Sequence, residues 1–250
     1  MENIIKDIAI LILAGGKGKR MESELPKVLA PLKGETMIMH IVKELQKVTT
    51  QKPIAIVGHK AELVREHLGE LCSYVIQEEQ LGTGHAVSCA KEKTKDAKHI
   101  LVLSGDQPFI KSETIINLIN KHINSEAKIT LTTTTVSDFE DFRKGFNFFG
   151  RIKRENGKIT GIKEYKDADE EERDIKEVNA GCYIFEADWL WKNLENIKAE
   201  NVQKEYYLTD LLHIASTENE KIESIDIEPY EALGANTKSE LETLESLNLE

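Results

Sequence analysis

Short apolar runs alternate with amphipathic runs along the first half of the chain. The apolar runs are rich in Ile, Leu and Val and are bounded by glycine or polar residues, which predicts buried strands. These strands are expected at Ile8–Ala14, Pro53–Val57, Cys72–Gln77, His99–Leu103 and Ala127–Val136. The runs between them have apolar residues at helical spacing and predict helices over Met37–Val48, Ala61–Leu68 and Ser112–Asn124, with a further helix starting within Ala86–Ala90. Strand–helix units repeated in this way predict an α/β protein with a mainly parallel, doubly wound, Rossmann-like sheet.

The pattern changes near Asp138. Residues Gly150–Asp167 form two alternating runs around Asn156-Gly157, which predicts a β-hairpin. Val178–Phe185 resumes a strand, so we interpret 138–182 as an inserted β-rich lobe between a core of 1–137 and a return to that core over 183–250. Within the return, the pattern predicts a helix over Lys204–Ala215, a strand over Ile222–Ile227 and a C-terminal helix within Gly234–Leu247. Thr36 and Ser112 are the expected N-caps of their helices, and Gly69 the expected helix end.

Composition narrows the class of protein. The 250 residues are 40% apolar and 31% charged, which is typical of a soluble protein large enough for one substantial core. The formal net charge of −11 argues against nucleic acid or an anionic membrane as a partner, because both need a basic face. Three widely spaced cysteines without a C-x-x-C pair indicate reduced thiols and no zinc site. With no membrane-length apolar run and no leader-like start, we expect a cytoplasmic protein.

The stretch after the first predicted strand has the composition of a polyphosphate-binding loop. Glycines let backbone N–H groups approach an anion closely, and the cations interleaved with them neutralise it. The residues concerned are Gly15, Gly16, Lys17, Gly18, Lys19, Arg20 and Lys27. The loop matches neither G-x-x-x-x-G-K-[ST] nor G-x-G-x-x-G, since Met21 stands where the last glycine of the second motif belongs. A tight turn with solvated lysines is the alternative.

Two later strand ends carry further candidate ligands. Asp106 follows the strand His99–Leu103, at the edge where open α/β sheets bind ligands, and a carboxylate there suits Mg²⁺ between protein and phosphate oxygens. An Asx turn before Pro108 is the alternative. Gln77 and Gln80 follow another strand, and their amides can recognise a nucleobase edge or belong to a polar loop.

The inserted lobe contributes two candidate ligands for an acceptor substrate. Glu164 and Asn179 offer a carboxylate and an amide, which suit sugar hydroxyls and an acyl amine. Each could also be an ordinary surface residue.

Several motifs occur together, in order, over nearly the whole chain. They are LAGGKGKRM, LPKVL, QEEQLGTGHA, GDQP, NGKITGIKE, VNAG, EYYLTD and GANTKSEL. Together they resemble the uridyltransferase domain of the bacterial N-acetylglucosamine-1-phosphate uridyltransferase/glucosamine-1-phosphate acetyltransferase. This resemblance implies a Rossmann-like nucleotidyltransferase sheet with a sugar-binding lobe.

The resemblance also implies roles for individual residues. Arg20 and Lys27 would neutralise the triphosphate and the developing pyrophosphate, and Asp106 would bind Mg²⁺ together with Asn236. The nucleoside and its phosphates would lie against Leu13, Ala14, Gly15 and Gly16. Uracil would be selected by Gln77, Gly82 and Thr83, and the sugar would be held by Gly150, Glu164 and Asn179.

The implied reaction is transfer of UMP from UTP to N-acetylglucosamine 1-phosphate, with Mg²⁺ as cofactor and pyrophosphate as the second product. The chain departs from the family at Ser104 and in GFNFFGR, Gly145–Arg151. These departures motivate an alternative in which another hexose 1-phosphate or TTP is used. A nucleotide-sugar sensor without turnover is the alternative from another class. No stretch resembles the acetyltransferase β-helix of the family, so we expect no acetyl-CoA chemistry and a monomer or weak oligomer.

Overall fold

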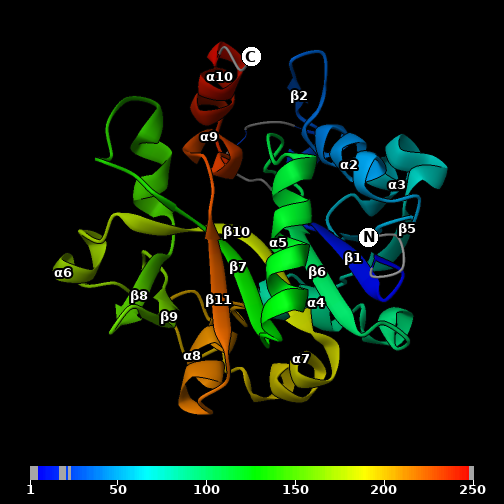
Figure 1. Cartoon of the computed structure of the whole chain (residues 1–250). Helices are drawn as coiled ribbons and strands as arrows, with labels where there is room; N and C mark the ends of the chain where they lie inside the picture. Colours follow the sequence, from blue (N-terminus) through cyan, green and yellow to red (C-terminus); the bar gives the residue numbers. More distant parts are fainter. Residues whose placement is uncertain (1–4, 17–20, 22–23, 248–250) are drawn as a thin grey trace.

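Within the part of the chain that the structure describes, a mixed sheet of nine strands runs through the molecule (Figure 1), and β2 (Pro31–Leu32) and β3 (Glu35–Thr36) form a separate two-stranded sheet. The computed structural model describes residues 5–16, 21 and 24–247. Within them the main row of the sheet is, in spatial order, β11 (Ile222–Asp226), β7 (Ile129–Thr135), β10 (Glu177–Glu186), β6 (His99–Ser104), β1 (Ile8–Ala14), β4 (Ile54–Val57) and β5 (Ser73–Ile76). Strand β10 is antiparallel to both of its neighbours, and the other neighbouring pairs are parallel. The mainly parallel sheet predicted from the apolar runs is confirmed.

Strand β1 is buried on both faces, which explains its unbroken apolar sequence. Ile8, Ile10 and Ile12 belong to the hydrophobic cluster on one face, and Leu11 belongs to the cluster on the other. The helices divide in the same way. The first cluster includes residues of α2 (Met37–Val48), α3 (Ala61–Leu68), α5 (Ser112–Ser125), α9 (Pro229–Ala232) and α10 (Lys238–Ser246), and the second includes residues of α4 (Thr83–Ser88), α7 (Ala187–Asn193) and α8 (Asp210–Thr217). The sheet is therefore doubly wound.

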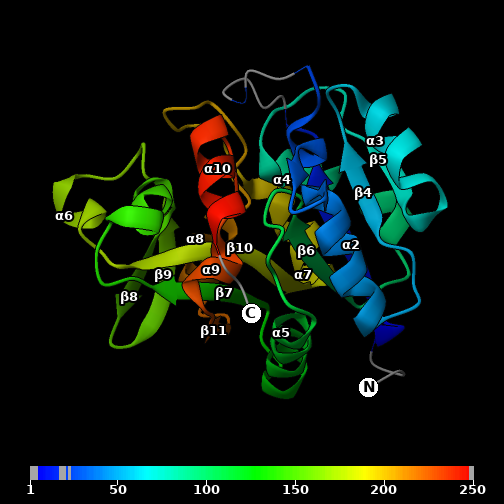
Figure 2. The same cartoon turned by 90° about the horizontal axis from the view of Figure 1, so that it is seen from above.

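The predicted hairpin is present as β8 (Arg151–Glu155) and β9 (Lys158–Lys163). Asn156 and Gly157 have φ angles of 51° and 79°, the left-handed values that a two-residue hairpin turn needs. The pairing of Val178 with Arg151 attaches the hairpin to β10. Figures 1 and 2 show it on the side of the molecule away from α3 and β5. The division into a core and an inserted lobe stays a prediction.

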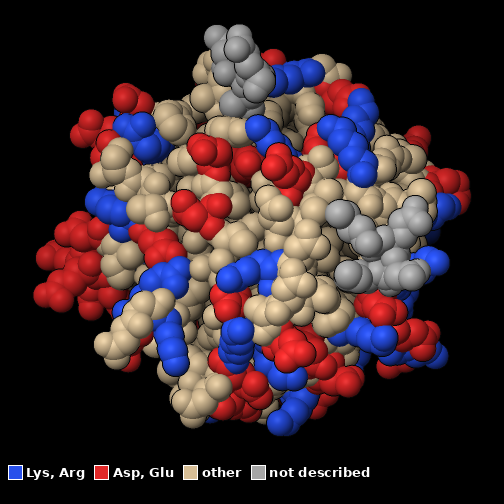
Figure 3. Space-filling view, viewed as in Figure 1, with Lys and Arg blue, Asp and Glu red and all other residues tan. Residues whose placement is uncertain are grey.

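Shorter elements complete the chain. They are β2 (Pro31–Leu32), β3 (Glu35–Thr36), α6 (Glu170–Arg173), and the 3-10 turns η2 (Lys27–Leu29), η3 (Gly69–Leu71), η4 (Lys91–Thr94), η5 (Asp141–Phe148) and η6 (Leu194–Asn196). Acidic side chains gather over α6, whereas acidic and basic residues intermingle over much of the rest of the face shown in Figure 3. No helix among the described residues has the length and apolar character needed to span a membrane.

Thr36 is the N-cap residue of α2 as predicted, but its hydroxyl bonds to the His67 ring at 2.9 Å rather than to a helix N–H. Two other local predictions are wrong, because tertiary contacts replace local ones. Ser112 is the first helical residue of α5, where Glu44 accepts a hydrogen bond from its backbone N–H. The helix predicted over 204–215 begins at Asp210. The segment before it is extended against the loop at 81–84, which uses its backbone hydrogen-bonding groups.

Arg151 anchors the start of the hairpin. Its side chain is fully buried, yet its guanidinium donates to backbone oxygens: Phe146 O at 3.3 Å, Asn147 O at 3.0 Å, Arg173 O at 3.1 Å and Phe149 O. The centroid of the Phe139 ring lies 4.7 Å from the guanidinium carbon, which is a cation–π distance. A planar group with five donors satisfies several carbonyls at once, which no other side chain can do. Arg151 therefore fixes η5 against β8.

We expect Arg151→Met to lower the free energy of unfolding by about 3 kcal/mol or more, because several buried carbonyl oxygens then lose their hydrogen-bond donor. At this chain length the melting temperature should fall by roughly 6–12 °C in calorimetry. Arg143→Met is the matched control, because Arg143 pairs with the partly exposed Asp138 at the surface and its loss should change the melting temperature much less. Equal losses in the two variants would contradict the anchoring role.

Candidate functional site

Two neighbouring parallel strands place the predicted phosphate loop beside the predicted metal ligand. Leu13 of β1 is in register with Ser104 of β6, so Gly15 and Asp106 follow adjacent strand ends at the same sheet edge. The Gly105 N–H donates to Leu13 O at 2.9 Å, and a Cβ on Gly105 would lie 2.7 Å from that oxygen. Glycine at 105 thus allows the Asp106 turn to pack directly on the end of β1.

A cavity of about 600 Å³ opens at this edge. Its walls include most of the residues predicted to bind the nucleotide, although they come from distant parts of the chain. Leu13, Ala14, Gly15, Gly16, Lys27, Gln77, Gly82, Thr83 and Asp106 all line it. Ser104, Gln80 and Glu205 line it as well. Arg20 and the loop glycine Gly18 lie outside the described residues, so their predicted roles stay predictions.

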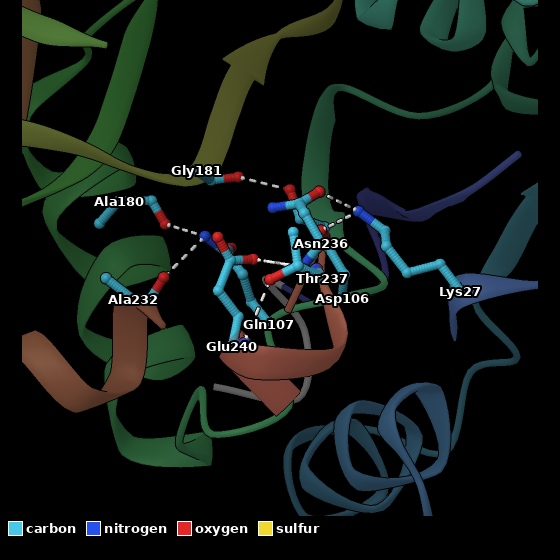
Figure 4. A network of polar contacts seen from close by, with 10 residues as sticks. Lys27, Asp106, Gln107, Ala180, Gly181, Ala232, Asn236, Thr237 and Glu240 are labelled. Atoms are coloured by element: carbon cyan, nitrogen blue, oxygen red, sulfur yellow. Dashed lines mark hydrogen bonds and ion pairs between the residues drawn. The ribbon is translucent and has the colours of Figure 1, made fainter. Parts of the chain in front are cut away.

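Lys27 is held between the two residues predicted to bind metal (Figure 4). Its ammonium group forms an ion pair with Asp106 Oδ2 and donates to Asn236 Oδ1 at 2.8 Å. The Lys27 and Asp106 side chains are only 17% and 21% exposed, so water screens this pair less than it screens a surface pair. One carboxylate oxygen and one amide oxygen therefore converge on a single cation.

The start of α10 fixes the position of Asn236. Thr237 and Glu240 form a capping box, and the Glu240 carboxylate also accepts from the Asn236 N–H at 2.6 Å. On the other side, the buried Gln107 side chain donates to Ala180 O at 2.9 Å and Ala232 O at 3.2 Å. It therefore ties the Asp106 turn to β10 and α9, as Figure 4 shows.

The oxygen pair fits a magnesium ion. No group of three or more His, Cys, Asp or Glu side chains in the described ranges is placed to hold a metal. Mg²⁺ does not need such a cage, because it usually binds one or two protein oxygens and completes its shell with water and substrate phosphates. Asp106 and Asn236, already converging on a cation at the phosphate-loop edge, have the required chemistry.

Gln77 is nearly fully buried and its amide protons are both engaged. Its Nε2 donates to Gly82 O at 3.1 Å and to His85 Nδ1 at 3.1 Å. With Nδ1 of His85 accepting, the neutral ring carries its proton on Nε2. The Gln77 side chain therefore offers the cavity its Oε1, an acceptor.

The segment Glu205–Thr209, which the residue pattern assigned to a helix, instead hydrogen-bonds to the loop at 81–84 that follows Gln77. The backbone N–H of Tyr206 donates to Leu81 O at 2.7 Å, and the backbone carbonyl oxygen of Tyr206 accepts from the Gly84 N–H at 2.8 Å. A Cβ on Gly82, whose φ is 116°, would lie 2.6 Å from Tyr206 O, so this contact needs glycine. The Leu208 N–H donates to Thr83 Oγ1 at 3.0 Å. The motif EYYLTD was the available sequence signal, but its contacts with the loop were not foreseeable.

The three predicted sugar ligands also lie together. The Asn179 N–H donates to Gly150 O at 2.8 Å, and a Cβ on Gly150 would lie 3.5 Å from both Glu164 carboxylate oxygens. Thr209, which the residue pattern did not single out, donates to Glu164 Oε1 at 2.8 Å. Burial raises the pKa of the Glu164 carboxyl. These three residues do not line the 600 Å³ cavity; Glu164 lines a neighbouring one of about 670 Å³ between the hairpin and α8.

Asn179 also braces a bulge in β10. Its Oδ1 accepts from the Gly181 N–H at 3.1 Å, and its Nδ2 donates to the Tyr183 hydroxyl. Gly181, with a φ of 81°, packs against the Gln107 amide. The Ser104 hydroxyl donates to Gly181 O at 3.4 Å. The bulge thus joins the sugar-side trio, Gly150, Glu164 and Asn179, to the Asp106 turn.

Comparison with known proteins agrees with the fold. Residues 10–141 match the MobA-like NTP transferase domain, and the chain therefore belongs to that family. Its relatives include the bifunctional protein GlmU of Streptococcus uberis, 41% identical over 239 residues that cover 95% of this chain and 51% of the relative. GlmU of Desulfotalea psychrophila is 40% identical over 94% of this chain and 68% of its own length. The chain spans about half the length of the streptococcal relatives. The predicted family resemblance is confirmed.

Solved structures show the same fold. A Bacillus anthracis protein described as a glucose-1-phosphate thymidylyltransferase matches with a TM-score of 0.73 and 18% identity, over 97% of each chain. A UDP-glucose pyrophosphorylase in complex with UDP-glucose matches with a TM-score of 0.72 and 16% identity, over 94% of this chain and 96% of the other.

We expect Glu164→Gln to stabilise the protein increasingly above pH 4.5. The raised pKa means that the folded state holds this proton more tightly than the unfolded state, so the wild type loses stability as pH rises through and above 4.5. Glutamine has no ionisable carboxyl, so the variant does not lose this stability as pH rises. The difference in melting temperature between variant and wild type should grow from pH 4 to pH 8, by about 2 °C or more.

Glu172→Gln is the control with the opposite sign, because Lys153 lowers the pKa of the Glu172 carboxyl. The wild type gains stability from this pair above pH 4.5, so the control variant should become relatively less stable as pH rises. A pH-independent effect of Glu164→Gln would contradict the raised pKa.

Proposed function

We propose that this chain transfers UMP from UTP to N-acetylglucosamine 1-phosphate and releases pyrophosphate. The observation that carries the proposal is the cavity of about 600 Å³ that gathers Gly15, Gly16, Lys27, Gln77 and Asp106 at one sheet edge. Two loop glycines with Lys27, an amide acceptor and the Asp106 carboxylate in one cavity suit a nucleoside triphosphate. The confirmed kinship with GlmU supports the same activity.

The base would be recognised by the Gln77 acceptor. Uracil presents an N3–H donor, whereas cytosine presents an unprotonated N3. Because Gly82 O and His85 Nδ1 occupy both amide protons of Gln77, its Oε1 would accept from uracil and repel cytosine. A buried acceptor left without its donor costs free energy, so the cavity would discriminate against CTP.

The transfer needs no protein nucleophile. An oxygen of the sugar phosphate attacks the α-phosphorus, and the bond to the bridging oxygen of the β-phosphate breaks. Mg²⁺ held by Asp106 and Asn236 would supply neutralisation of the phosphate charge. Lys27 would stabilise the charge that develops on the leaving pyrophosphate, and the backbone N–H groups at Gly15 and Gly16 would orient the triphosphate.

The sugar would lie against the trio Gly150, Glu164 and Asn179. The Glu164 carboxylate, fixed by Thr209, has a second oxygen available for a sugar hydroxyl. Arg151 ties Gly150 to the divergent stretch Gly145–Phe149, so that stretch borders the trio. Because the divergent stretch borders the proposed sugar site, another hexose 1-phosphate is the second candidate substrate.

The decisive experiment measures pyrophosphate release with Mg²⁺ for UTP, TTP and CTP, each with N-acetylglucosamine 1-phosphate or glucose 1-phosphate. We expect the highest kcat/KM for UTP with the N-acetylated sugar, and at least about 100-fold less for CTP. A higher kcat/KM with glucose 1-phosphate would show that the proposed sugar substrate is wrong. A higher kcat/KM with TTP would show that the proposed nucleotide is wrong. Absence of turnover alongside calorimetric binding of the nucleotide sugar would favour the sensor.

Lys27 and the metal would compete for the same oxygens. In the structure the ammonium occupies the point where Asp106 and Asn236 converge, so Lys27 must turn towards the phosphates when the metal–nucleotide complex binds. Removing this internal cation frees both ligands and leaves their negative potential uncompensated.

We therefore expect Lys27→Met to bind Mn²⁺ about 10-fold more tightly in the absence of nucleotide, while turnover falls about 100-fold. Electron paramagnetic resonance titration of Mn²⁺ measures the first effect independently of activity. Lys43→Met is the matched control, because Lys43 pairs with Glu35 at the surface and should change neither quantity. Unchanged or weaker Mn²⁺ binding by Lys27→Met would refute the competition.

A further inference from the structure

His85 of α4 contacts the side chain proposed to recognise the base, but it does not line the nucleotide cavity itself. Its ring nitrogen Nδ1 lies 3.1 Å from Gln77 Nε2. Gln77 lines the cavity of about 600 Å³, whereas His85 lines a separate cavity of about 250 Å³. His85 can therefore influence a nucleotide in the larger cavity through Gln77.

The carbonyl oxygen of Gly82 sets the direction of the Gln77 amide. This oxygen accepts from the Ala86 N–H at 3.0 Å, at the start of α4, and from Gln77 Nε2 at 3.1 Å. A carbonyl oxygen only accepts, so the amide nitrogen of Gln77 must point towards it. The second proton of that nitrogen is donated to His85 Nδ1.

The oxygen of the same amide, Gln77 Oε1, lies on the side of Gly15. A Cβ on Gly15 would be 3.0 Å from it. Within the described ranges, the hydrogen bonds of the Gln77 side chain are all made by Nε2. A reversed amide would bring Oε1 against two acceptors, Gly82 O and His85 Nδ1, and would lose both hydrogen bonds. The side chain is only 4% exposed, so water cannot readily replace them.

The backbone around His85 is held in place on both sides. The Gly84 N–H donates to Tyr206 O at 2.8 Å, and the Leu208 N–H donates to Thr83 Oγ1 at 3.0 Å. These bonds attach the first turn of α4 to the extended segment that precedes α8. The position of His85 relative to Gln77 is therefore fixed by the fold.

We propose that His85 is a positioning residue that determines which pyrimidine nucleotide the cavity accepts. Its Nδ1, together with Gly82 O, keeps the Gln77 amide in the orientation that presents Oε1 to the base. That acceptor matches the N3–H of uracil, whereas a reversed amide would present N–H groups and match the unprotonated N3 of cytosine. The proposal rests on the proposed function and adds to it a residue outside the nucleotide cavity.

The kinetic test compares UTP with CTP as substrates of His85→Leu, with N-acetylglucosamine 1-phosphate and Mg²⁺ present. Leucine fills most of the space of the ring and removes the acceptor. Because one hydrogen bond fewer then holds the amide, the ratio of kcat/KM for UTP to that for CTP should fall about 5-fold or more. A residue that only supported the fold would lower kcat/KM for both nucleotides alike and leave the ratio unchanged.

His85→Asn is the rescue variant, because the asparagine Oδ1 can accept from Gln77 in place of Nδ1. It should keep the wild-type ratio to within about 2-fold. His67→Leu is the matched control, since His67 bonds to the Thr36 hydroxyl at 2.9 Å and lines neither cavity. This control should leave the ratio unchanged. An unchanged ratio in His85→Leu, or equal losses in His85→Leu and His85→Asn, would overturn the proposal.

A spectroscopic measurement tests the hydrogen bond without any nucleotide. In a long-range proton–nitrogen correlation spectrum of the ¹⁵N-labelled chain at about pH 8, where free imidazole is neutral, His85 Nδ1 should be unprotonated. Gln77→Leu should move the Nδ1 signal downfield, because this nitrogen then loses a hydrogen bond, and should leave the His67 signals in place. A protonated Nδ1 in the wild type, or an unmoved signal in the variant, would overturn the positioning role.

The two measurements separate this proposal from the proposed function. Wild-type protein that prefers UTP, with the same preference in His85→Leu, would overturn the role of His85 and leave the proposed function standing. Wild-type protein that does not turn over UTP would refute the proposed function and the specificity role together. The Nδ1 signal would still decide whether His85 orients Gln77.

Discussion

The site depends on one cation held between oxygens from distant parts of the chain. Lys27, Asp106 and Asn236 come from η2, the end of β6 and the start of α10, and they meet because the sheet brings these elements to one edge. A carboxylate and an amide oxygen aimed at the same point repel each other unless a positive charge lies between them. The ammonium provides it here, and a metal ion can provide it when substrate phosphates are present to receive the ammonium.

The segment Glu205–Thr209 connects the two halves of the site. Its Tyr206 backbone holds the loop around Gly82, and the Thr209 hydroxyl fixes the Glu164 carboxylate. A single short stretch of backbone therefore contacts both halves.

Much of the fold could be predicted from the sequence because its signals are local. The apolar runs of β1 and β6 and the helical spacing of α2 depend only on burial, and Asn156-Gly157 specifies its turn through the positive φ angles it tolerates. The predicted nucleotide ligands share a cavity because each follows or faces a strand end. Thr209 and the Tyr206 clasp could not be predicted from periodicity, since their hydrogen bonds join residues far apart in sequence and replace a helix that the local pattern favours.

By itself, the sequence determined the alternation of strands and helices and the motifs that place the chain in its family, and it predicted the phosphate loop with its cations. The tertiary structure alone decided which cation meets Asp106 and which protons of the Gln77 amide are engaged by Gly82 and His85. The reason is physical. Burial and turn preference act on neighbouring residues, whereas hydrogen-bond satisfaction depends on the geometry of groups that only the folded chain brings together.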